Sequence, residues 1–146
     1  MRILVLNGPN LNMTGRREPK IYGTRTMDEI IADLALKAKE HGCEDLTHYQ
    51  TNYEGELIDR LQAAGDRYDA VILNAGALTH YSYALRDAIA CCGIPVAEVH
   101  MSDITKREPF RATDVIRDVC AFCVMGLGEH SYFRALDLLC EAYENR

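Results

Sequence analysis

The sequence has little of what marks disordered, fibrous or membrane-spanning proteins. Only 4 prolines and 10 glycines occur among its 146 residues, whereas 48% of the residues are hydrophobic. Such a chain can bury enough apolar surface to offset the entropy lost on ordering, which excludes a disordered linker and a collagen-like fibre. No apolar run approaches the roughly 18 residues of a membrane-spanning helix, and the longest candidate, residues 120–127, is typical of a buried strand.

Positive charge is also scarce in the chain as a whole. The sequence has 16 Lys and Arg against 22 Asp and Glu, which gives a formal net charge of −6. Nucleic acids and anionic membrane surfaces bind to basic faces, so we expect neither as a partner. The apolar segment at residues 3–6 is too short for a secretory signal peptide, and no small-residue cleavage pattern follows it. We therefore expect a cytoplasmic protein.

The chain has six cysteines but lacks the small size and the secretory signal of a disulfide-stapled protein. A length of 146 residues is enough for one domain of ordinary size, so we expect a single domain over residues 1–146 with reduced thiols. Cys120 and Cys123 have the spacing of redox and zinc sites. Residues three apart on a strand point to opposite faces, however, and no further zinc ligands are evident. We expect buried thiols there and no metal.

Apolar runs typical of strands alternate with segments of helical spacing along the whole chain. Thr26 and Glu29 form a capping box that starts a helix, and Gly42 ends it. The continuous apolar run at residues 70–73 is typical of a central parallel strand. The expected strands are 3–6, 45–51, 70–73, 95–99 and 120–125, and the other expected helices are 54–64, 81–92, a short stretch before the last strand, and the C-terminal segment. This alternation predicts a three-layer α/β/α flavodoxin-like fold with a five-stranded parallel sheet of order 2-1-3-4-5.

Three loops at the carboxyl ends of these strands are the place to expect a ligand. In such a sheet, ligands bind outside the carboxyl ends of the strands, near the point where the strand order reverses. The loop over residues 7–25 far exceeds the usual connection of about 2–6 residues, which indicates a binding loop or a lid. Residues 14–25 carry four cations and one carboxylate, and residues 106–111 carry three cations and one carboxylate. The predicted fold brings both basic loops to one crevice, where a small carboxylate can bind.

A family resemblance rests on motifs spread over most of the chain. In order, these motifs are LNGPNLN, GRREPKIYG, NYEGELID, LNAGALTHYSYALRDA, EVHMSD and REPFR. The sequence resembles the type II 3-dehydroquinate dehydratases throughout this span, up to Arg111. The resemblance implies a lyase of the shikimate pathway with a flavodoxin-like fold that converts 3-dehydroquinate, a small-molecule substrate, to 3-dehydroshikimate without a cofactor. It also implies a homododecamer built from trimers.

The resemblance also assigns roles to individual residues. Tyr22 resembles the general base of the family, and Arg17 the cation that favours its deprotonated form. His100 resembles the general acid, and Asn10 the residue that positions the catalytic water or the enolate. The implied substrate-binding residues are Asn74, His80, Met101, Ser102 and Arg111, together with Asp87, which reaches the site of a neighbouring subunit.

The chemistry of these side chains agrees with an anti elimination through an enolate. A phenol is largely protonated at neutral pH, and a nearby guanidinium favours the phenolate that can remove a proton next to a ketone. Tyr22 and Arg17 share one loop, which can close over the substrate and exclude water. A histidine that titrates near neutrality suits the protonation of the departing hydroxyl. Glu98, two residues before His100 on the same strand face, can hold the tautomer of that histidine.

The chain departs from the family pattern after Ser102. Asp103, Thr105, Lys106 and Pro109 stand where the family typically has Asn, a His-Ala pair and Glu, and residues 117–123 also differ. An Asp103 side chain that points inward would repel an anionic substrate. These departures motivate one alternative, a catalytically retired family member that acts as a ligand-binding or scaffold protein.

A second alternative is a receiver-like or flavin-binding module on the same fold. It is disfavoured because the first strand ends in Asn7 rather than in an acidic cluster, and because no Ser/Thr-rich phosphate loop follows. Gly126 and Gly128 precede the last helix, but the third glycine of a dinucleotide fingerprint and the acid-ended strand after it are missing.

Overall fold

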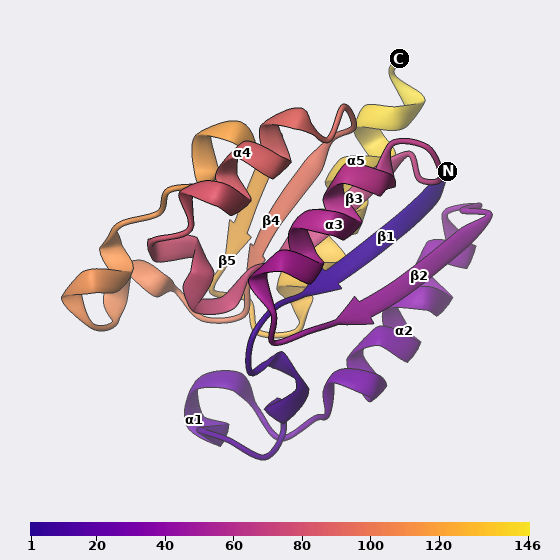
Figure 1. Cartoon of the computed structure of the whole chain (residues 1–146). Helices are drawn as coiled ribbons and strands as arrows, with labels where there is room; N and C mark the ends of the chain where they lie inside the picture. The colour runs from indigo at the N-terminus through magenta and orange to yellow at the C-terminus, as the bar shows by residue number, and fades with distance from the viewer.

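The molecule is built on a parallel sheet that crosses its centre. The computed structural model describes all 146 residues and contains five parallel strands in the order β2-β1-β3-β4-β5 (Figure 1). The strands are β1 (Arg2–Asn7), β2 (Asp45–Gln50), β3 (Ala70–Asn74), β4 (Val96–His100) and β5 (Phe122–Met125). The predicted strand order is confirmed, and the strand ends lie within two residues of the predicted ranges.

Helices cover both faces of the sheet. Side chains alternate along β1, so Ile3 and Val5 pack in one cluster with α2 (Met27–Glu40) and α5 (His130–Glu144), while Leu4 and Leu6 pack in another with α3 (Glu54–Ala64) and α4 (Tyr83–Cys91). Figure 1 shows α3 and α4 in front of the strands, with both chain ends at the edge opposite the arrowheads. The helices are α1 (Pro19–Tyr22), α2 (Met27–Glu40), α3 (Glu54–Ala64), α4 (Tyr83–Cys91) and α5 (His130–Glu144). The predicted three-layer, flavodoxin-like fold is confirmed, and no helix has the length and apolarity needed to cross a membrane.

Local capping explains where two of the helices begin. At α2, the Thr26 hydroxyl accepts from the Glu29 amide at 3.3 Å, and the Glu29 carboxylate accepts from the Thr26 amide at 2.8 Å, as the sequence predicts. The helix predicted to start at Tyr81 begins at Tyr83 instead, because the Ser82 hydroxyl caps it by accepting from the Leu85 amide at 3.0 Å. The preceding residues, Gly76–His80, form a 3₁₀ turn at the end of β3.

A buried polar network joins α5 to the central strands beneath their carboxyl ends. The Tyr132 hydroxyl donates to Asn7 Oδ1 at 2.6 Å and accepts from Asn74 Nδ2 at 3.0 Å. Burial raises the pKa of the fully enclosed Tyr132 phenol, which therefore stays neutral. Because every polar atom in this chain of contacts has a partner, the network fixes the ends of β1 and β3 relative to each other.

Candidate active site

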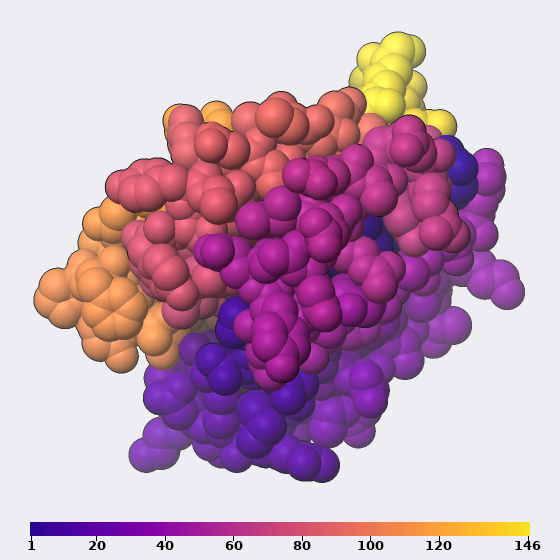
Figure 2. Space-filling model, viewed as in Figure 1, coloured from indigo at the N-terminus to yellow at the C-terminus, as the bar shows by residue number.

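A cleft opens at the carboxyl ends of β1, β3 and β4, where the strand order reverses. The cleft, including its open mouth, has a volume of about 540 Å³. Fifteen residues line it, and most of them belong to the loops after these three strands. Figure 2 shows the chain before residue 26, in indigo and violet, and the segment after β4, in orange, projecting at this end of the molecule. Nine of the eleven predicted site residues line the cleft: Asn10, Arg17, Tyr22, Asn74, His80, His100, Met101, Ser102 and Arg111.

Two glycines allow the loops after β1 and β3 to approach closely. A Cβ atom on Gly8 would lie 2.8 Å from the Ala75 carbonyl oxygen, and one on Gly76 would lie 3.0 Å from the Pro9 carbonyl oxygen. Asn10, the residue after Pro9, adopts a left-handed conformation with φ 69°. Its backbone amide donates to Asn52 Oδ1 at 3.0 Å. This strained conformation is held by the surrounding contacts at the edge of the cleft, as is typical of functional sites.

Tyr22 lies between two arginines that come from different loops. Arg107 Nη1 donates to the Tyr22 hydroxyl oxygen at 2.8 Å and to Ser102 Oγ at 3.3 Å. The guanidinium carbon of Arg17 lies 4.5 Å from the centre of the Tyr22 ring, over its face rather than at its hydroxyl. The sequence assigned the activating charge to Arg17 alone and missed Arg107. The available signal was the position of Arg107 at the start of the matching segment REPFR.

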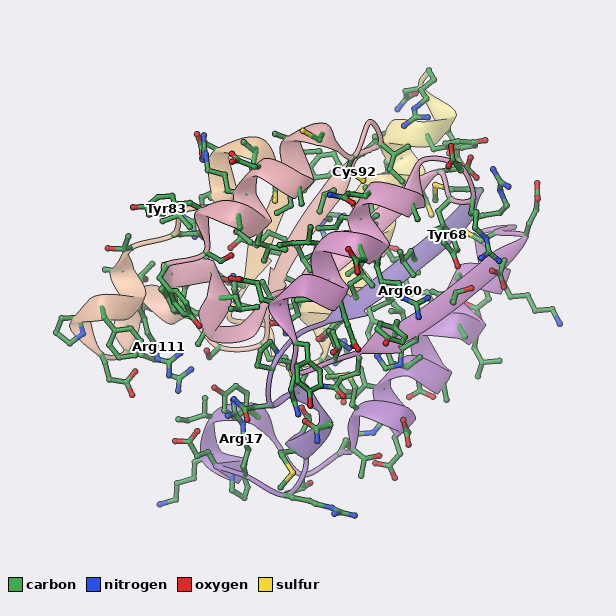
Figure 3. The ribbon with its side chains drawn as sticks, in the orientation of Figure 1. Arg17, Arg60, Tyr68, Tyr83, Cys92 and Arg111 are labelled. Carbon is green, nitrogen blue, oxygen red and sulfur yellow. The ribbon has the colours of Figure 1, made fainter.

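The cleft is cationic although the chain is acidic. Arg17, Arg107 and Arg111 line it, and no Asp or Glu is among the fifteen lining residues. Figure 3 shows Arg17 and Arg111 at this end of the molecule, extending from the two segments toward the space between them. The prediction that two basic loops meet at one crevice is confirmed for these arginines. Such a cleft attracts a small anion.

Two charged residues near the cleft do not take part in it. Arg25 belongs to the basic loop over residues 14–25. It forms ion pairs with Asp33 at 2.7 Å and Glu129 at 2.8 Å instead of lining the cleft. Asp103 accepts from the Thr105 amide at 3.1 Å and lies 3.6 Å from Lys106 Nζ, and it does not line the cleft. Repulsion of an anionic substrate was predicted only for an Asp103 side chain that points inward, and Asp103 does not line the cleft.

His100 is held from behind by Glu98. His100 Nε2 lies 2.6 Å from Glu98 Oε1, and the Glu98 side chain is completely buried outside the cleft. Because an ionised carboxylate only accepts hydrogen bonds, Nε2 carries the proton and Nδ1 is left for the cleft. Burial lowers the pKa of His100 to about 4, so the ring is neutral at neutral pH rather than titrating there.

His80 is held in the opposite tautomer. Its Nδ1 donates to the Thr113 carbonyl oxygen at 2.7 Å, which leaves Nε2 as an acceptor, and its ring packs edge-on against Phe110. Burial lowers the pKa of His80. The neutral ring offers a hydrogen-bond acceptor to a hydroxyl group. Asn74, which also lines the cleft, is held by the Gly76 amide, 3.2 Å from its Oδ1.

Asp87, Cys120 and Cys123 lie outside the cleft. Asp87 is on the exposed side of α4, and its role in the site of a neighbouring subunit stays a prediction. Burial raises the pKa of Cys123 to about 12 and also raises that of Cys120. Because redox chemistry needs the thiolate, these protonated thiols disfavour it.

The fold and the cleft define a flavodoxin-like protein with a cationic cleft at the carboxyl ends of its strands. The family model for dehydroquinase class II matches residues 1–140. A 3-dehydroquinate dehydratase of Roseiflexus castenholzii is 52% identical over 139 residues, which cover 95% of this chain and 88% of that protein. The enzyme of the same name from Anoxybacillus flavithermus is 50% identical over 146 residues, covering 100% of this chain and 98% of its own.

A solved structure shows the same likeness. The crystal structure of a type II dehydroquinase from Butyrivibrio crossotus matches with a TM-score of 0.92 at 41% identity, covering 95% of this chain and 97% of that one. The chain belongs to the class II dehydroquinase family. The resemblance drawn from the sequence motifs is thereby confirmed.

Proposed function

We propose that this protein removes water from 3-dehydroquinate to form 3-dehydroshikimate, by anti elimination through an enolate. The relatives named above carry the name of this activity. The observation that carries the proposal is the hydrogen bond of 2.8 Å from Arg107 to the Tyr22 hydroxyl, in the same cleft as His100, which Glu98 holds from behind. It provides one candidate base and one candidate acid in a single cationic cleft.

Tyr22 acts as the base in this mechanism. Arg107 at its hydroxyl and Arg17 over its ring both favour the phenolate, because a positive charge stabilises a nearby anion and does so more strongly once substrate has displaced water. The phenolate removes the proton next to the ketone, and the electron pair of the broken C–H bond forms the enolate. Asn10, at the edge of the cleft, positions the water or the enolate.

His100 acts as the acid. The enolate re-forms the ketone and expels the β-hydroxyl group, which leaves as water after it accepts a proton from the ring. The resting ring is neutral, so it takes up this proton from solvent as the substrate binds, and the Glu98 carboxylate stabilises the resulting imidazolium. The Tyr22 proton returns to solvent and restores the base.

The remaining lining residues suit a polyhydroxylated carboxylate. Arg111 and the Ser102 hydroxyl lie where they can bind the carboxylate, since a guanidinium and hydroxyl groups are its natural partners. His80 Nε2 and the Asn74 side chain can bind the substrate hydroxyls. No metal or organic cofactor enters any step of this scheme.

A direct assay tests this function. The native protein is incubated with 3-dehydroquinate, and the ultraviolet absorbance of the conjugated enone product is followed. Tyr22→Phe should lower kcat by about 10²–10⁴-fold, the usual contribution of a general base, whereas Tyr143→Phe, on the exposed side of α5, should not change it. A variant Tyr22→Phe with native activity would refute the mechanism.

The same samples decide between the alternatives. A native protein that binds 3-dehydroquinate in calorimetry but releases no product would be the retired family member. Yellow colour and a flavin spectrum in the purified protein would support the flavin-binding module instead.

We also propose that the protein assembles as a homododecamer of trimers, as the family resemblance implies. The exposed aromatic side chains of Tyr81, Tyr83 and Phe110 support an assembly, because large apolar groups on a surface favour association. Light scattering on the native protein tests the mass, and a monomer at assay concentration would contradict the proposal and the role of Asp87 across subunits.

A further inference from the structure

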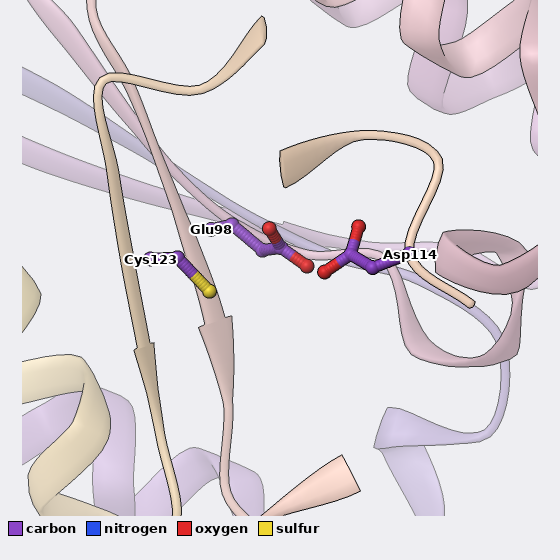
Figure 4. Close-up of side chains that lie close together, drawn as sticks. All are labelled: Glu98, Asp114 and Cys123. Carbon is purple, nitrogen blue, oxygen red and sulfur yellow. The ribbon is translucent and has the colours of Figure 1, made fainter. Parts of the chain in front are cut away.

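Behind His100, Glu98 meets a second buried carboxyl group. Its Oε1 is bound to His100, while its Oε2 and Asp114 Oδ2 are both buried without a hydrogen-bond partner. One oxygen of each carboxyl and the Cys123 sulfur lie within 4.8 Å of one another. Figure 4 shows the two carboxyl groups facing each other, with the Cys123 sulfur pointing toward Glu98.

The backbone after Asp114 fixes the direction of its side chain. Asp114 Oδ1 accepts from the amides of Ile116 at 3.1 Å and Arg117 at 3.0 Å. The neighbouring Val115 amide in turn donates to the Thr79 carbonyl oxygen at 2.9 Å, which ties this segment to the turn after β3. Only 7% of the Asp114 side chain is exposed. Oδ1 is thus used by the turn, Oδ2 lies 3.3 Å from Arg117 Nε, and the carboxyl group faces that of Glu98 (Figure 4).

One shared proton accounts for both unpartnered oxygens. Two ionised carboxylates that face each other in a buried place repel and lack hydrogen bonds, which is costly. A proton on Asp114 converts the repulsion into an O–H···O hydrogen bond from Asp114 Oδ2 to Glu98 Oε2. Burial, followed by the neighbouring Glu98, raises the pKa of Asp114 to about 6, in the direction that this arrangement requires.

A metal ion is the competing explanation for these three groups. Two carboxylates and a thiol can bind a divalent metal. Arg117 Nε, however, lies 3.3 Å from Asp114 Oδ2, so the cluster already has a positive charge beside it. This observation favours a proton over a metal.

We propose that Asp114 is a positioning residue for the dehydration: it shares one proton with Glu98 and thereby holds Glu98 as the acceptor of His100 Nε2–H. His100 Nδ1 then faces the substrate. The proposal rests on the function proposed above for the same cleft. Asp114 does not line the cleft, so it acts through Glu98 alone.

The surroundings predict how pH affects this pair. The titratable and charged groups around the pair are His80, His100, Arg111, Arg117, Cys120 and Cys123. Below about pH 6 Asp114 keeps the proton and donates it to Glu98. Above about pH 6 Asp114 is ionised, and its negative charge raises the proton affinity of His100. This change should appear as an inflection near pH 6 in the ring signals of His100.

The test compares native protein with Asp114→Asn and Asp114→Ala by ¹⁵N NMR of the histidine rings between pH 4.5 and 8. The His100 signals are assigned by their loss in His100→Gln. Asp114→Asn keeps the Oδ1 acceptor and can donate Nδ2–H to Glu98, so it should keep the tautomer with a proton on Nε2 and lose the inflection near pH 6. Asp114→Ala should show a mixture of tautomers.

Kinetics supply the second measurement. Asp114→Ala should lower kcat by about 10–100-fold, as is usual when the partner of an active-site group is lost, and should leave KM within about twofold. Asp114→Asn should stay within about threefold of the native kcat. Asp118→Asn is the matched control, because this exposed carboxylate pairs with Arg86 on the surface; it should leave both kcat and the inflection unchanged.

Several results would overturn the proposal. An inflection near pH 6 that persists in Asp114→Asn would show that Asp114 does not hold the proton, and a native His100 tautomer with native kcat in Asp114→Ala would show that it does not position the ring. Stoichiometric zinc in the purified protein would show that Glu98, Asp114 and Cys123 hold a metal ion rather than a shared proton. If Asp114→Ala does not fold, Asp114→Asn alone decides. Because the NMR experiment needs no turnover, an inactive native protein would refute the proposed function without deciding this pair.

Discussion

The two sides of the cleft are built in opposite ways. Tyr22 lies on a helix of four residues within a long loop, and its partners are arginines from that loop and from the segment after β4. His100 and Glu98 lie on a central strand and are almost completely buried. The base therefore depends on positive charges on half-buried side chains near solvent, whereas the acid depends on burial and on a buried carboxylate. The two sides should respond differently to mutation, salt and pH.

The largest effect should follow removal of the positive charge at the Tyr22 hydroxyl. Arg107→Ala should lower kcat by about 10²–10³-fold, because it removes a charged donor from the reacting oxygen. Arg107→Lys keeps the charge and should recover part of the loss. Steady-state kinetics of both variants beside Arg17→Ala rank the two arginines. A smaller fall in kcat for Arg107→Ala than for Arg17→Ala would contradict the main stabilising role given to Arg107.

A smaller loss should follow a change on the acid side. Glu98→Gln keeps the shape of the side chain but removes the charge that stabilises the imidazolium, so kcat should fall by about 10–100-fold with little change in KM. The pH dependence of kcat measures the role directly, since the fall in kcat at high pH, where the acid loses its proton, should move toward lower pH. An unchanged limb would show that the charge of Glu98 does not act on His100.

Salt should separate the two sides without any mutation. Exposed charges are screened within about 8 Å at physiological ionic strength, whereas buried pairs are screened much less. KM should therefore rise several-fold between about 0.05 and 0.5 M salt as the arginines lose their attraction for the substrate, while kcat changes little. A fall in kcat at constant KM would mean that salt reaches the buried side.

The smallest effect concerns stability. The pKa of Asp114 is raised to about 6, so the folded protein holds a proton that the unfolded chain has released by that pH. This contribution to the free energy of unfolding is fully present at low pH and is lost as the pH rises from about 4 through 6. Asp114→Asn lacks this contribution. The free energy of unfolding of the native protein, relative to that of the variant, should therefore decrease between about pH 4 and pH 6.

Urea denaturation of both proteins at several pH values measures this difference. The lowered pKa of His100 has the opposite effect, because the stability gained from its neutral ring is lost as the pH falls toward 4. Both proteins contain His100, so the comparison removes this effect except for the part that depends on the charge of Asp114. A relative stability that is constant or rises with pH would contradict the shared proton.

Much of the fold was predictable because its signals are local. The apolar run at residues 70–73 and the Thr26–Glu29 capping box each depend on neighbours within a few residues, and both elements occur as predicted. The start of α4 was predicted two residues early, since periodicity alone does not reveal that Ser82 caps the helix. The likeness of the motifs to a known family was sufficient to identify nine of the residues that line the cleft.

The sequence by itself determined the order of the strands, the loops that follow them and the family, because apolar periodicity, caps and motifs are properties of neighbouring residues. Only the tertiary structure decided which cation lies at the Tyr22 hydroxyl, since Arg107 is 85 positions away along the chain. It also decided that Asp103 turns away from the cleft and that Asp114 faces Glu98. Such contacts depend on side-chain direction and on burial, and packing of distant segments sets both.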